Sequence, residues 1–312
     1  MSFSLSVKNE LARVFDKNTC CKTAELSAVI KSRANIQITG GHLKLVFTTS
    51  NAAIARKVVK LLKMLFQIQT KVMYYKRGCF RKNNLYVLKI SKHLNTLRLI
   101  SELGIWDKKS NMPVLDIKKV LKNDCCLKAY LRGVFLGGGS INNPKSNYHL
   151  EISIDDVEYT KKILSLMKKI DIHAKVCMRK TQNIIYLKDG DKIIKFLGFI
   201  GAHSALLDFE NTRVYKSVRG QVNRLINCET ANLNKTVNAA VRQTENIRYI
   251  DRTIGLNKLT PALKEAAELR LHYPDVGLKE LGKLIDPPIS KSGINHRMRK
   301  LEEIANNLKN KS

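Results

Sequence analysis

An internal repeat limits the folds that are open to this chain. Residues 20–36 and 125–141 align at a constant offset of 105 residues, without a gap. The identical pairs are Cys20/Cys125, Cys21/Cys126, Ala24/Ala129, Leu26/Leu131, Val29/Val134 and Ile36/Ile141. A repeat of this kind indicates that one structural unit occurs twice. We expect the two copies to pack as pseudo-symmetric halves, through the helix that begins each copy.

The residues after each copy show the same order of hydrophobic patterns: strand, amphipathic helix, two more strands and a closing helix. The predicted elements are strands 42–49 and 148–155, helices 52–66 and 157–170, strands 70–76, 84–90, 174–180 and 183–189, and helices 93–103 and 191–200. The pattern predicts an α+β domain over residues 1–212, built from a duplicated αββαββα unit. Its halves are expected at about 1–106 and 122–212, with a connector at 107–121.

Residues 258–312 carry a purely helical pattern, which opens at Thr260 and Pro261 with a cap and a proline suited to the first helical position. Pro287 and Pro288 end a short helix, and Ser290 is the N-cap of a second one. The apolar residues are Leu278, Leu281, Leu284 and Ile285 in the short helix, and Ile294, Met298, Leu301, Ala305 and Leu308 in the second. The pattern predicts an all-α helix-turn-helix domain.

The polar residues of the second helix predict a surface that reads DNA. With about 100° of rotation per residue, burial of Ile294 and Leu301 turns the polar residues of the first turns outward. The candidate DNA-binding residues are Ser290, Lys291, Ser292, Asn295, His296, Arg297, Arg299 and Lys300. A recognition helix needs hydrogen-bonding groups for base edges and cations for phosphates. A small bundle with a solvated polar face is the alternative, but the proline turn, the serine cap and the placement of the polar residues favour recognition.

The charge of the chain favours a polyanionic partner. It has 56 basic and 26 acidic residues, a net charge of +30, and residues 1–218 alone hold 39 basic and 16 acidic side chains. The larger domain is therefore itself a candidate surface for a polyanion. No apolar run approaches the ~20 residues of a membrane span, and Lys8 and Glu10 lie where a signal peptide needs an apolar core, so we expect a cytoplasmic protein.

Residues 213–257 form a polar segment between the two predicted domains. Their apolar positions are Val218, Val222, Leu225, Leu233, Val237, Val241 and Ile250, and the intervening residues are rich in asparagine, threonine and arginine. A helical connector that brings polar groups to phosphates would have this composition, and so would a solvated linker. Both interpretations stay open from the sequence.

Two segments of the repeat resemble the LAGLIDADG motif of homing endonucleases. Residues 131–140 read LRGVFLGGGS, and residues 26–35 read LSAVIKSRAN, which is a more divergent copy. Gly133, Gly137 and Ala28 would let two helix backbones approach closely, as at the central interface of that family.

The same resemblance places the metal-binding positions of the nucleases in this chain. In that family a carboxylate near the end of each motif binds the catalytic divalent ion, and the aligned residues here are Arg33 and Gly138. Neither can bind a metal, so hydrolysis by metal-activated water is not supported. Asp155 and Asp156 occur in the second copy alone, and we interpret them as a polar strand end and a helix N-terminus.

The cysteines are interpreted as structural. Cys20 and Cys21 are adjacent, as are Cys125 and Cys126, whereas zinc sites usually separate paired cysteines by two to four residues. The total of seven is odd and the expected compartment is reducing, which argues against disulfides. We therefore expect small buried side chains at the start of each interface helix, and no metal or cofactor.

Long segments along nearly the whole chain resemble the WhiA family of bacterial regulators. Beside the paired cysteines, they are SFSLSVKNELAR, YLRGVFLGGGSINNPKSNYHLEIS, IGAHSALLDFEN, NRLINCETANLNKT and LKELGKLIDPPISKSGINHRMRKL. The resemblance implies a degenerate LAGLIDADG fold joined to a C-terminal helix-turn-helix. It also implies regulation of transcription, in sporulation of actinobacteria and in cell division and chromosome segregation elsewhere. The implied partners are double-stranded DNA and a WhiB-type iron–sulfur regulator or RNA polymerase.

The sequence departs from the WhiA pattern at residues 33–35, where relatives more often end like the nuclease motif.

Three function classes are compatible with the sequence. The first is a sequence-specific, non-enzymatic DNA-binding regulator associated with the nucleoid, and the second is a residual nuclease or nucleic-acid-processing enzyme. The third is an assembly scaffold whose larger domain binds protein. The missing carboxylates favour the regulator, because a fold alone does not establish a function.

Overall fold

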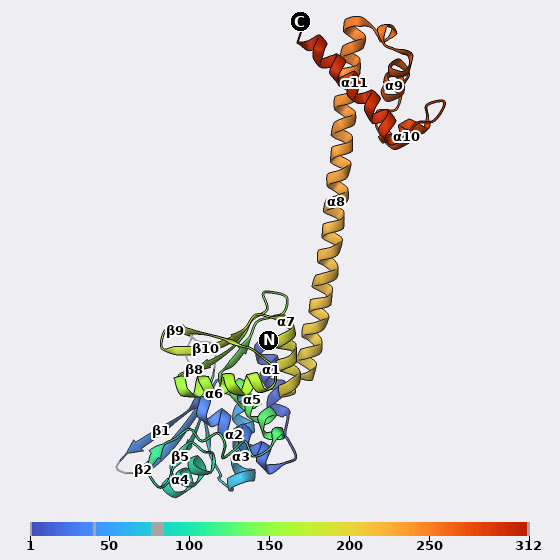
Figure 1. Cartoon of the computed structure of the whole chain (residues 1–312). Coiled ribbons are helices and arrows are strands. Elements are labelled where there is room, and N and C mark those ends of the chain that lie inside the picture. The colour runs from blue at the N-terminus through green and yellow to red at the C-terminus, as the bar shows by residue number, and fades with distance from the viewer. Residues whose placement is uncertain (1, 40–41, 76–83, 311–312) are drawn as a thin grey trace. The chain divides into compact units, whose positions relative to one another are not determined.

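A computed structural model describes residues 2–39, 42–75 and 84–310 (Figure 1). The chain divides into two compact units, residues 1–216 and 217–312. Helix α8 (His203–Ile254) contributes residues to both units. None of the described helices is both long enough and apolar enough to cross a membrane.

The first unit contains the predicted duplication, with the order helix, two strands, helix, two strands, helix in each half. The first half consists of α2 (Thr19–Arg33), β1 (Ala34–Thr39), β2 (His42–Thr49), α3 (Ala52–Phe66), β3 (Val72–Tyr75), β4 (Leu85–Ile90) and α4 (His93–Glu102). The second consists of α5 (Asp124–Gly138), β7 (Gly139–Ile141), β8 (Leu150–Ile154), α6 (Val157–Lys169), β9 (Lys175–Arg179), β10 (Gln182–Leu187) and α7 (Gly190–Ile200). The predicted α+β class is confirmed. Lys76, the last residue of the strand predicted at 70–76, lies outside the described residues.

Each half folds into a four-stranded antiparallel sheet with the same topology. The strand orders are β1-β2-β4-β3 and β7-β8-β10-β9. In β2 the side chains of Leu43, Leu45 and Phe47 alternate with more exposed ones, so one face of the sheet is buried. The helices α3 and α4 pack on the first sheet, and α6 packs on the second. One hydrophobic core joins the two halves, and it includes residues of β2, β4, β8 and β10 and of the helices that pack on them.

The two halves meet through α2 and α5, the helices that begin each copy. A Cβ atom added to Gly133 would lie 2.4 Å from the Glu25 carbonyl oxygen and 2.8 Å from Ala28 Cβ. At Gly137 it would lie 2.5 Å from Ser32 Cβ. Only glycine fits at these distances, which confirms the predicted close approach of the two backbones.

A buried ion network lies across the same helix pair. Arg132, which has no exposed surface, donates from Nε and Nη2 to the two carboxylate oxygens of Glu25, each at 3.1 Å. It also pairs with Asp16. Lys57 pairs with Glu25 and donates to the carbonyl oxygens of Leu11 and Val14. Burial opposes the charge of Arg132, but the two carboxylates raise its pKa above the ordinary value.

Two parts of the first unit differ from the sequence expectation. Helix α1 (Phe3–Arg13) lies outside the predicted repeat and buries Val7, Leu11 and Ala12. The predicted connector contains the short hairpin β5 (Trp106–Asp107) and β6 (Met112–Pro113), and its Ile117 and Val120 join the core. The segment therefore packs as part of the domain. Its few apolar residues are separated by lysines in the sequence, so they showed no clear pattern there.

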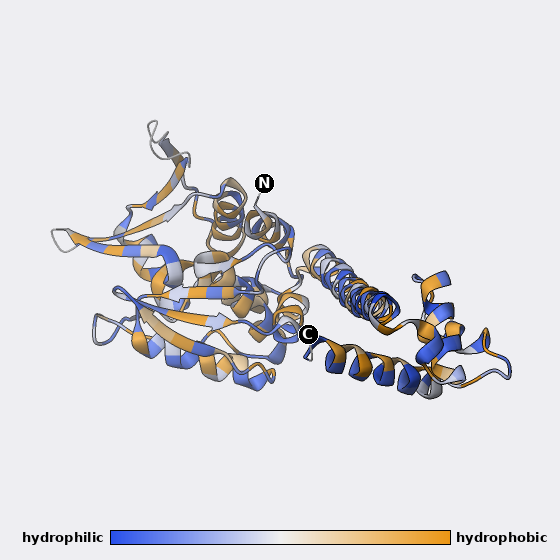
Figure 2. Cartoon of the chain, turned by 90° about the horizontal axis from the view of Figure 1, so that it is seen from above, coloured by the Kyte–Doolittle hydropathy of each residue, from blue (hydrophilic) through white to orange (hydrophobic). Residues whose placement is uncertain are grey.

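The second unit is helical, as predicted. Its elements are the end of α8, the 3-10 turn η1 (Leu256–Lys258), α9 (Pro261–His272), α10 (Leu278–Lys283) and α11 (Lys291–Lys309). One core joins them, and it includes Ile247 and Ile250 of α8. Figure 2 shows α11 with hydrophobic residues along one side and hydrophilic residues along the other. The apolar residues of α8 between Val218 and Val241 are exposed in this structure, apart from the half-buried Ala239 and the buried Ala240.

The close approach of α2 and α5 leads to a first prediction. Gly133→Ala should lower the free energy of unfolding of the first unit by ~1–3 kcal/mol, because the added methyl group overlaps the backbone of α2. Gly190→Ala is the matched control, since its Cβ would meet Tyr148 at an ordinary 3.4 Å. It should change stability by less than about 0.5 kcal/mol. Urea unfolding followed by circular dichroism measures both, and equal stability of the two variants would contradict the tight interface.

Candidate nucleic-acid interface

Helix α11 has the N-cap and the buried apolar face that the sequence predicts. Ser290 caps it, since its side-chain oxygen accepts a hydrogen bond from the Gly293 N–H at 3.2 Å. The residues that hold α11 on the domain core are Ile294, Met298, Leu301 and Ala305, all buried. These contacts fix the rotation of the helix about its axis, and with it the direction in which the polar residues point.

All eight candidate DNA-binding residues are at least partly exposed. Those exposed are Ser290, Lys291, Ser292, His296, Arg299 and Lys300, and those partly exposed are Asn295 and Arg297. Asn295 and Arg299 are one helical turn apart, so their side chains share a face. The exposed set contains three cations, Lys291, Arg299 and Lys300, and no carboxylate. The first turns of α11 thus present a cationic, hydrogen-bonding surface.

Arg297 differs from the other cations of α11 because it is engaged within the domain. Its Nη1 donates to the carbonyl oxygen of Ala262 and to the Glu265 carboxylate, both at 3.2 Å. This pair ties α11 to α9 and orients the two helices. A contact between Arg297 and a phosphate stays a prediction, and it would have to share the guanidinium with Glu265.

Arg270 has a structural role that was not predicted from the sequence. It is buried, and its Nη1 donates to the carbonyl oxygens of Tyr273, Pro274 and Val276, which holds the loop between α9 and α10. Burial lowers the pKa of Arg270 from its ordinary value. The burial of Arg270 could have been predicted from the sequence, because Arg270 lies on the same face of the helix as Leu263 and Ala267.

A second basic surface lies where α2 and α5 end, at the positions that carry the metal ligands in LAGLIDADG nucleases. Lys8 and Arg33 line a cavity of about 520 Å³ there, together with Gly137 and Ser140. Arg33 Nε donates to the Gly137 carbonyl oxygen. The described residues that line this cavity include no carboxylate. Burial, and then the charge of Arg33, lowers the pKa of Lys8 to about 8. Two cations at this place repel a divalent metal ion.

The backbone geometry at Gly138 also opposes a metal ligand. A Cβ atom added there would lie 2.4 Å from the Ser153 carbonyl oxygen. A carboxylate could be introduced at this position only if the strand β8 moved. The second half therefore lacks both the ligand and the room for it.

Asp155 and Asp156, the two aspartates that the sequence places in the second copy alone, have structural partners. Asp155 accepts a hydrogen bond from Gln182 at 2.7 Å. Asp156 caps α6 through the Tyr159 N–H and pairs with Lys31 at 3.2 Å. Burial opposes ionisation of Asp156, but these two donors lower its pKa. Both residues fit the predicted strand end and helix N-terminus.

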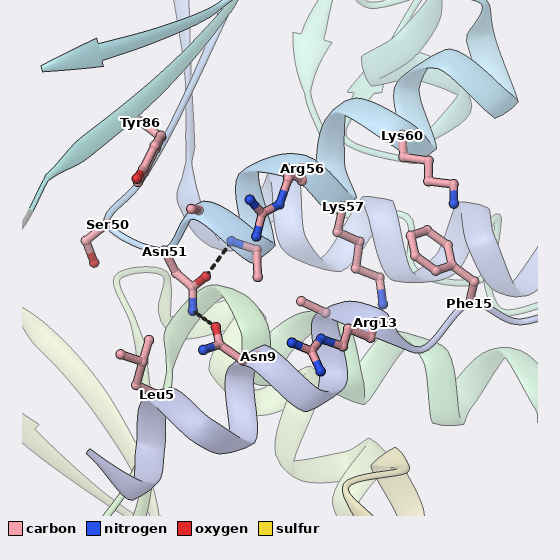
Figure 3. Close-up of a pocket in the computed structure, with 13 residues that line it drawn as sticks. Leu5, Asn9, Arg13, Phe15, Ser50, Asn51, Arg56, Lys57, Lys60 and Tyr86 are labelled. Carbon is pink, nitrogen blue, oxygen red and sulfur yellow. Dashed lines mark hydrogen bonds between the residues drawn. The ribbon is translucent and has the colours of Figure 1, made fainter. Parts of the chain in front are cut away.

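A third basic site is the pocket between α1 and α3 shown in Figure 3. The guanidinium groups of Arg13 and Arg56 lie between the two helices, and both side chains are exposed. Lys60 lies over the Phe15 ring, with Nζ 4.6 Å from its centroid. The pocket has a volume of about 610 Å³, and no carboxylate is among its described lining residues. Such a surface suits the phosphates of a polyanion.

The structure brings the two cysteine pairs together. The sulfur atoms of Cys20, Cys21, Cys125 and Cys126 all lie within 4.8 Å of one another. Cys21 and Cys126 are buried as expected, whereas Cys20 is half-buried and Cys125 is exposed. Adjacent cysteines seldom direct both thiolates at one ion, but here both sulfur atoms of each adjacent pair belong to the same cluster, where α2 and α5 begin.

Comparison with known proteins agrees with this architecture. The WhiA N-terminal LAGLIDADG-like domain matches residues 19–106, the WhiA LAGLIDADG-like domain matches residues 127–219, and the WhiA C-terminal HTH domain matches residues 222–305. The chain belongs to the WhiA family. The family resemblance of the sequence is thereby confirmed.

Full-length WhiA relatives support the assignment. The chain is 51% identical over 311 residues to the probable cell division protein WhiA of Desulforamulus reducens, covering 99% of this chain and 97% of the relative. It is 48% identical over 312 residues to that of Clostridium botulinum strain Hall, covering 99% of each. A crystal structure of full-length DUF199/WhiA from Thermatoga maritima matches with a TM-score of 0.61 and 25% identity, covering 98% of this chain and 99% of that one.

The lowered pKa of Lys8 leads to a second prediction for this WhiA chain. Below pH 8 Lys8 is protonated in both the folded and unfolded states, so the cost of its buried charge is fully present. From pH 8 to about 10.5 only the unfolded state binds the proton, and stability must rise with pH. The difference in unfolding free energy between the parent and Lys8→Met should therefore shift in favour of the parent over this interval. A constant difference would contradict the lowered pKa.

Proposed function

We propose that this chain is a sequence-specific DNA-binding regulator of transcription, without enzymatic activity, that acts in cell division and chromosome segregation. In relatives that sporulate, the same activity would control sporulation. The observation that carries the proposal is the exposed, cationic start of α11 on a helix-turn-helix core. The names of the relatives, probable cell division protein WhiA, support the cellular role.

In the proposed complex, the first turns of α11 enter the major groove, which is wide enough for a helix. Arg299 offers a two-pronged donor to guanine, and Asn295 one turn earlier can pair with adenine. Lys291 and Lys300 are placed to contact phosphates. Ser290 has its side-chain oxygen committed to the helix cap, so its contribution is to fix the helix start.

The first unit contributes affinity more than selectivity in this proposal. Its basic cavities contain Arg13, Arg56 and Lys60 at one place and Lys8 and Arg33 at another. Phosphate contacts of this kind release counterions and weaken steeply as salt is added. The protein would be cytoplasmic and bound to the nucleoid. A WhiB-type regulator and RNA polymerase are the partners that the family resemblance suggests.

The third prediction separates base reading from phosphate binding within α11. Arg299→Ala or Asn295→Ala should cost ~1–3 kcal/mol on the preferred site and relax the preference at one base position. Lys300→Ala should weaken all sequences equally and reduce the salt slope by about one. Selection from randomised DNA identifies the site, and titrations at several salt concentrations measure the slope.

Asn307→Ala is the matched control for these variants, because Asn307 is exposed on the same helix and lies three turns beyond Asn295. It should leave site and affinity unchanged. If the Arg299 and Asn295 variants select the same site as the parent with the same affinity, α11 is not the reading element. The asparagine-rich stretch of α8, around residues 223–238, would then be the better candidate.

The fourth prediction concerns the nuclease alternative. The purified chain should not cut DNA with magnesium or manganese, because Arg33 occupies one metal-ligand position and Gly138 has no room for a carboxylate at the other. Plasmid nicking assays with the full chain measure this. Cleavage that needs a divalent ion, persists after repurification and disappears in Asp155→Ala or Asp156→Ala would establish the nuclease instead.

A further inference from the structure

The four clustered cysteines begin the two helices that join the halves of the first unit. Cys20 and Cys21 lie in the first turn of α2, and Cys125 and Cys126 lie in the first turn of α5. The internal repeat relates each residue of one pair to a residue of the other. The four sulfur atoms are within 4.8 Å of one another and come from segments 105 residues apart.

These separations suit one tetrahedral metal ion. With Zn–S bonds of about 2.3 Å, tetrahedral geometry places the sulfur atoms about 3.8 Å apart. None of the observed sulfur–sulfur separations, which are at most 4.8 Å, exceeds this value by more than about 1 Å. A four-iron cluster binds each cysteine through a different iron and holds the sulfurs further apart, so a single ion fits better.

The surroundings of the cluster favour a negatively charged metal site. The N-cap residues Asn18 and Asn123 make no side-chain capping bond, so the first N–H groups of α2 and α5 are not satisfied in that way. Helix N-termini carry partial positive charge and stabilise thiolates. Within three residues of these cysteines along the chain lie one carboxylate, Asp124, and four lysines, Lys17, Lys22, Lys122 and Lys128.

We propose that Cys20, Cys21, Cys125 and Cys126 bind one zinc ion that joins α2 to α5. Four thiols lose four protons as the ion binds, and no oxidant or reductant is needed. With four protein ligands the ion has no open position for a substrate, so its role is structural. Cys20 and Cys125 reach the surface and provide the entry path, while Cys21 and Cys126 anchor the site in the core.

The zinc ion would connect α2 to α5 at the end of the helix pair that is remote from the basic cavity. Cys21 and Arg33 are twelve residues apart on α2, which corresponds to about 18 Å. The ion therefore does not restore nuclease chemistry at Arg33. It would instead oppose separation of the two halves, independently of the DNA contacts proposed for α11.

The fifth prediction is the metal content of the full chain. Protein purified without a metal-binding tag and reconstituted with zinc should retain about one equivalent after gel filtration, as measured by plasma mass spectrometry. Cobalt added to the metal-free protein should give the visible absorption of a tetrahedral thiolate site, and zinc should displace it. Removal of the metal should lower the melting temperature by at least about 5 °C.

Two double variants test the ligands. Cys20→Ser with Cys125→Ser removes the two accessible ligands with little change in packing, and it should retain less than roughly a tenth of an equivalent of zinc. Cys177→Ser with Cys228→Ser is the matched control, because both cysteines are exposed and lie outside the cluster. It should bind zinc like the parent. Circular dichroism checks that each variant is folded.

Experiments on the parent chain keep the proposal testable if a variant does not fold. Metal-free parent protein with reduced thiols that gains neither zinc, a cobalt spectrum nor thermal stability would refute the site. Mass spectrometry without added reductant would detect a disulfide among these cysteines. Such a disulfide, together with no zinc binding by the reduced protein, would also refute the zinc site. Equal zinc binding by both double variants would place the ion elsewhere.

Discussion

The structure of the first unit depends on the close contact between α2 and α5. Gly133 and Gly137 bring the two backbones together, and the Arg132 guanidinium is then fully buried against Glu25. A buried charge without its partner costs several kcal/mol, so this pair requires the two helices to keep one register and one spacing. Lys57 adds a third charge to the network and connects it to the end of α1 through the Leu11 and Val14 carbonyl groups.

The same helix pair has different chemistry at its two ends. The thiols of four cysteines gather where the helices begin, and cations gather where they end, at Lys8 and Arg33. In a LAGLIDADG nuclease the latter end would need carboxylates around a metal ion. Here the described lining residues include two cations and no carboxylate, and the likeness of the fold does not by itself establish the nuclease chemistry.

Much of the architecture could be predicted from local patterns. The repeat and its alternating and helical periods defined both halves, since each pattern follows directly from which face of a strand or helix is buried. Ser290, with the prolines before it, marked the start of α11, because capping and proline act within a few residues. Helix α1 was not predicted, and neither was the packing of residues 107–121, where isolated apolar residues gave no clear period.

The fold class, the glycine-mediated helix pair, the polar face of α11 and the lack of carboxylates at Arg33 and Gly138 could all be predicted from the sequence. Which distant residues meet was evident only from the packing of the elements. That packing gathers four cysteines from two distant segments into one cluster, and it pairs Arg297 with Glu265. The physical reason is that a periodic pattern specifies which side of one element is buried, whereas contacts between elements depend on how those elements pack.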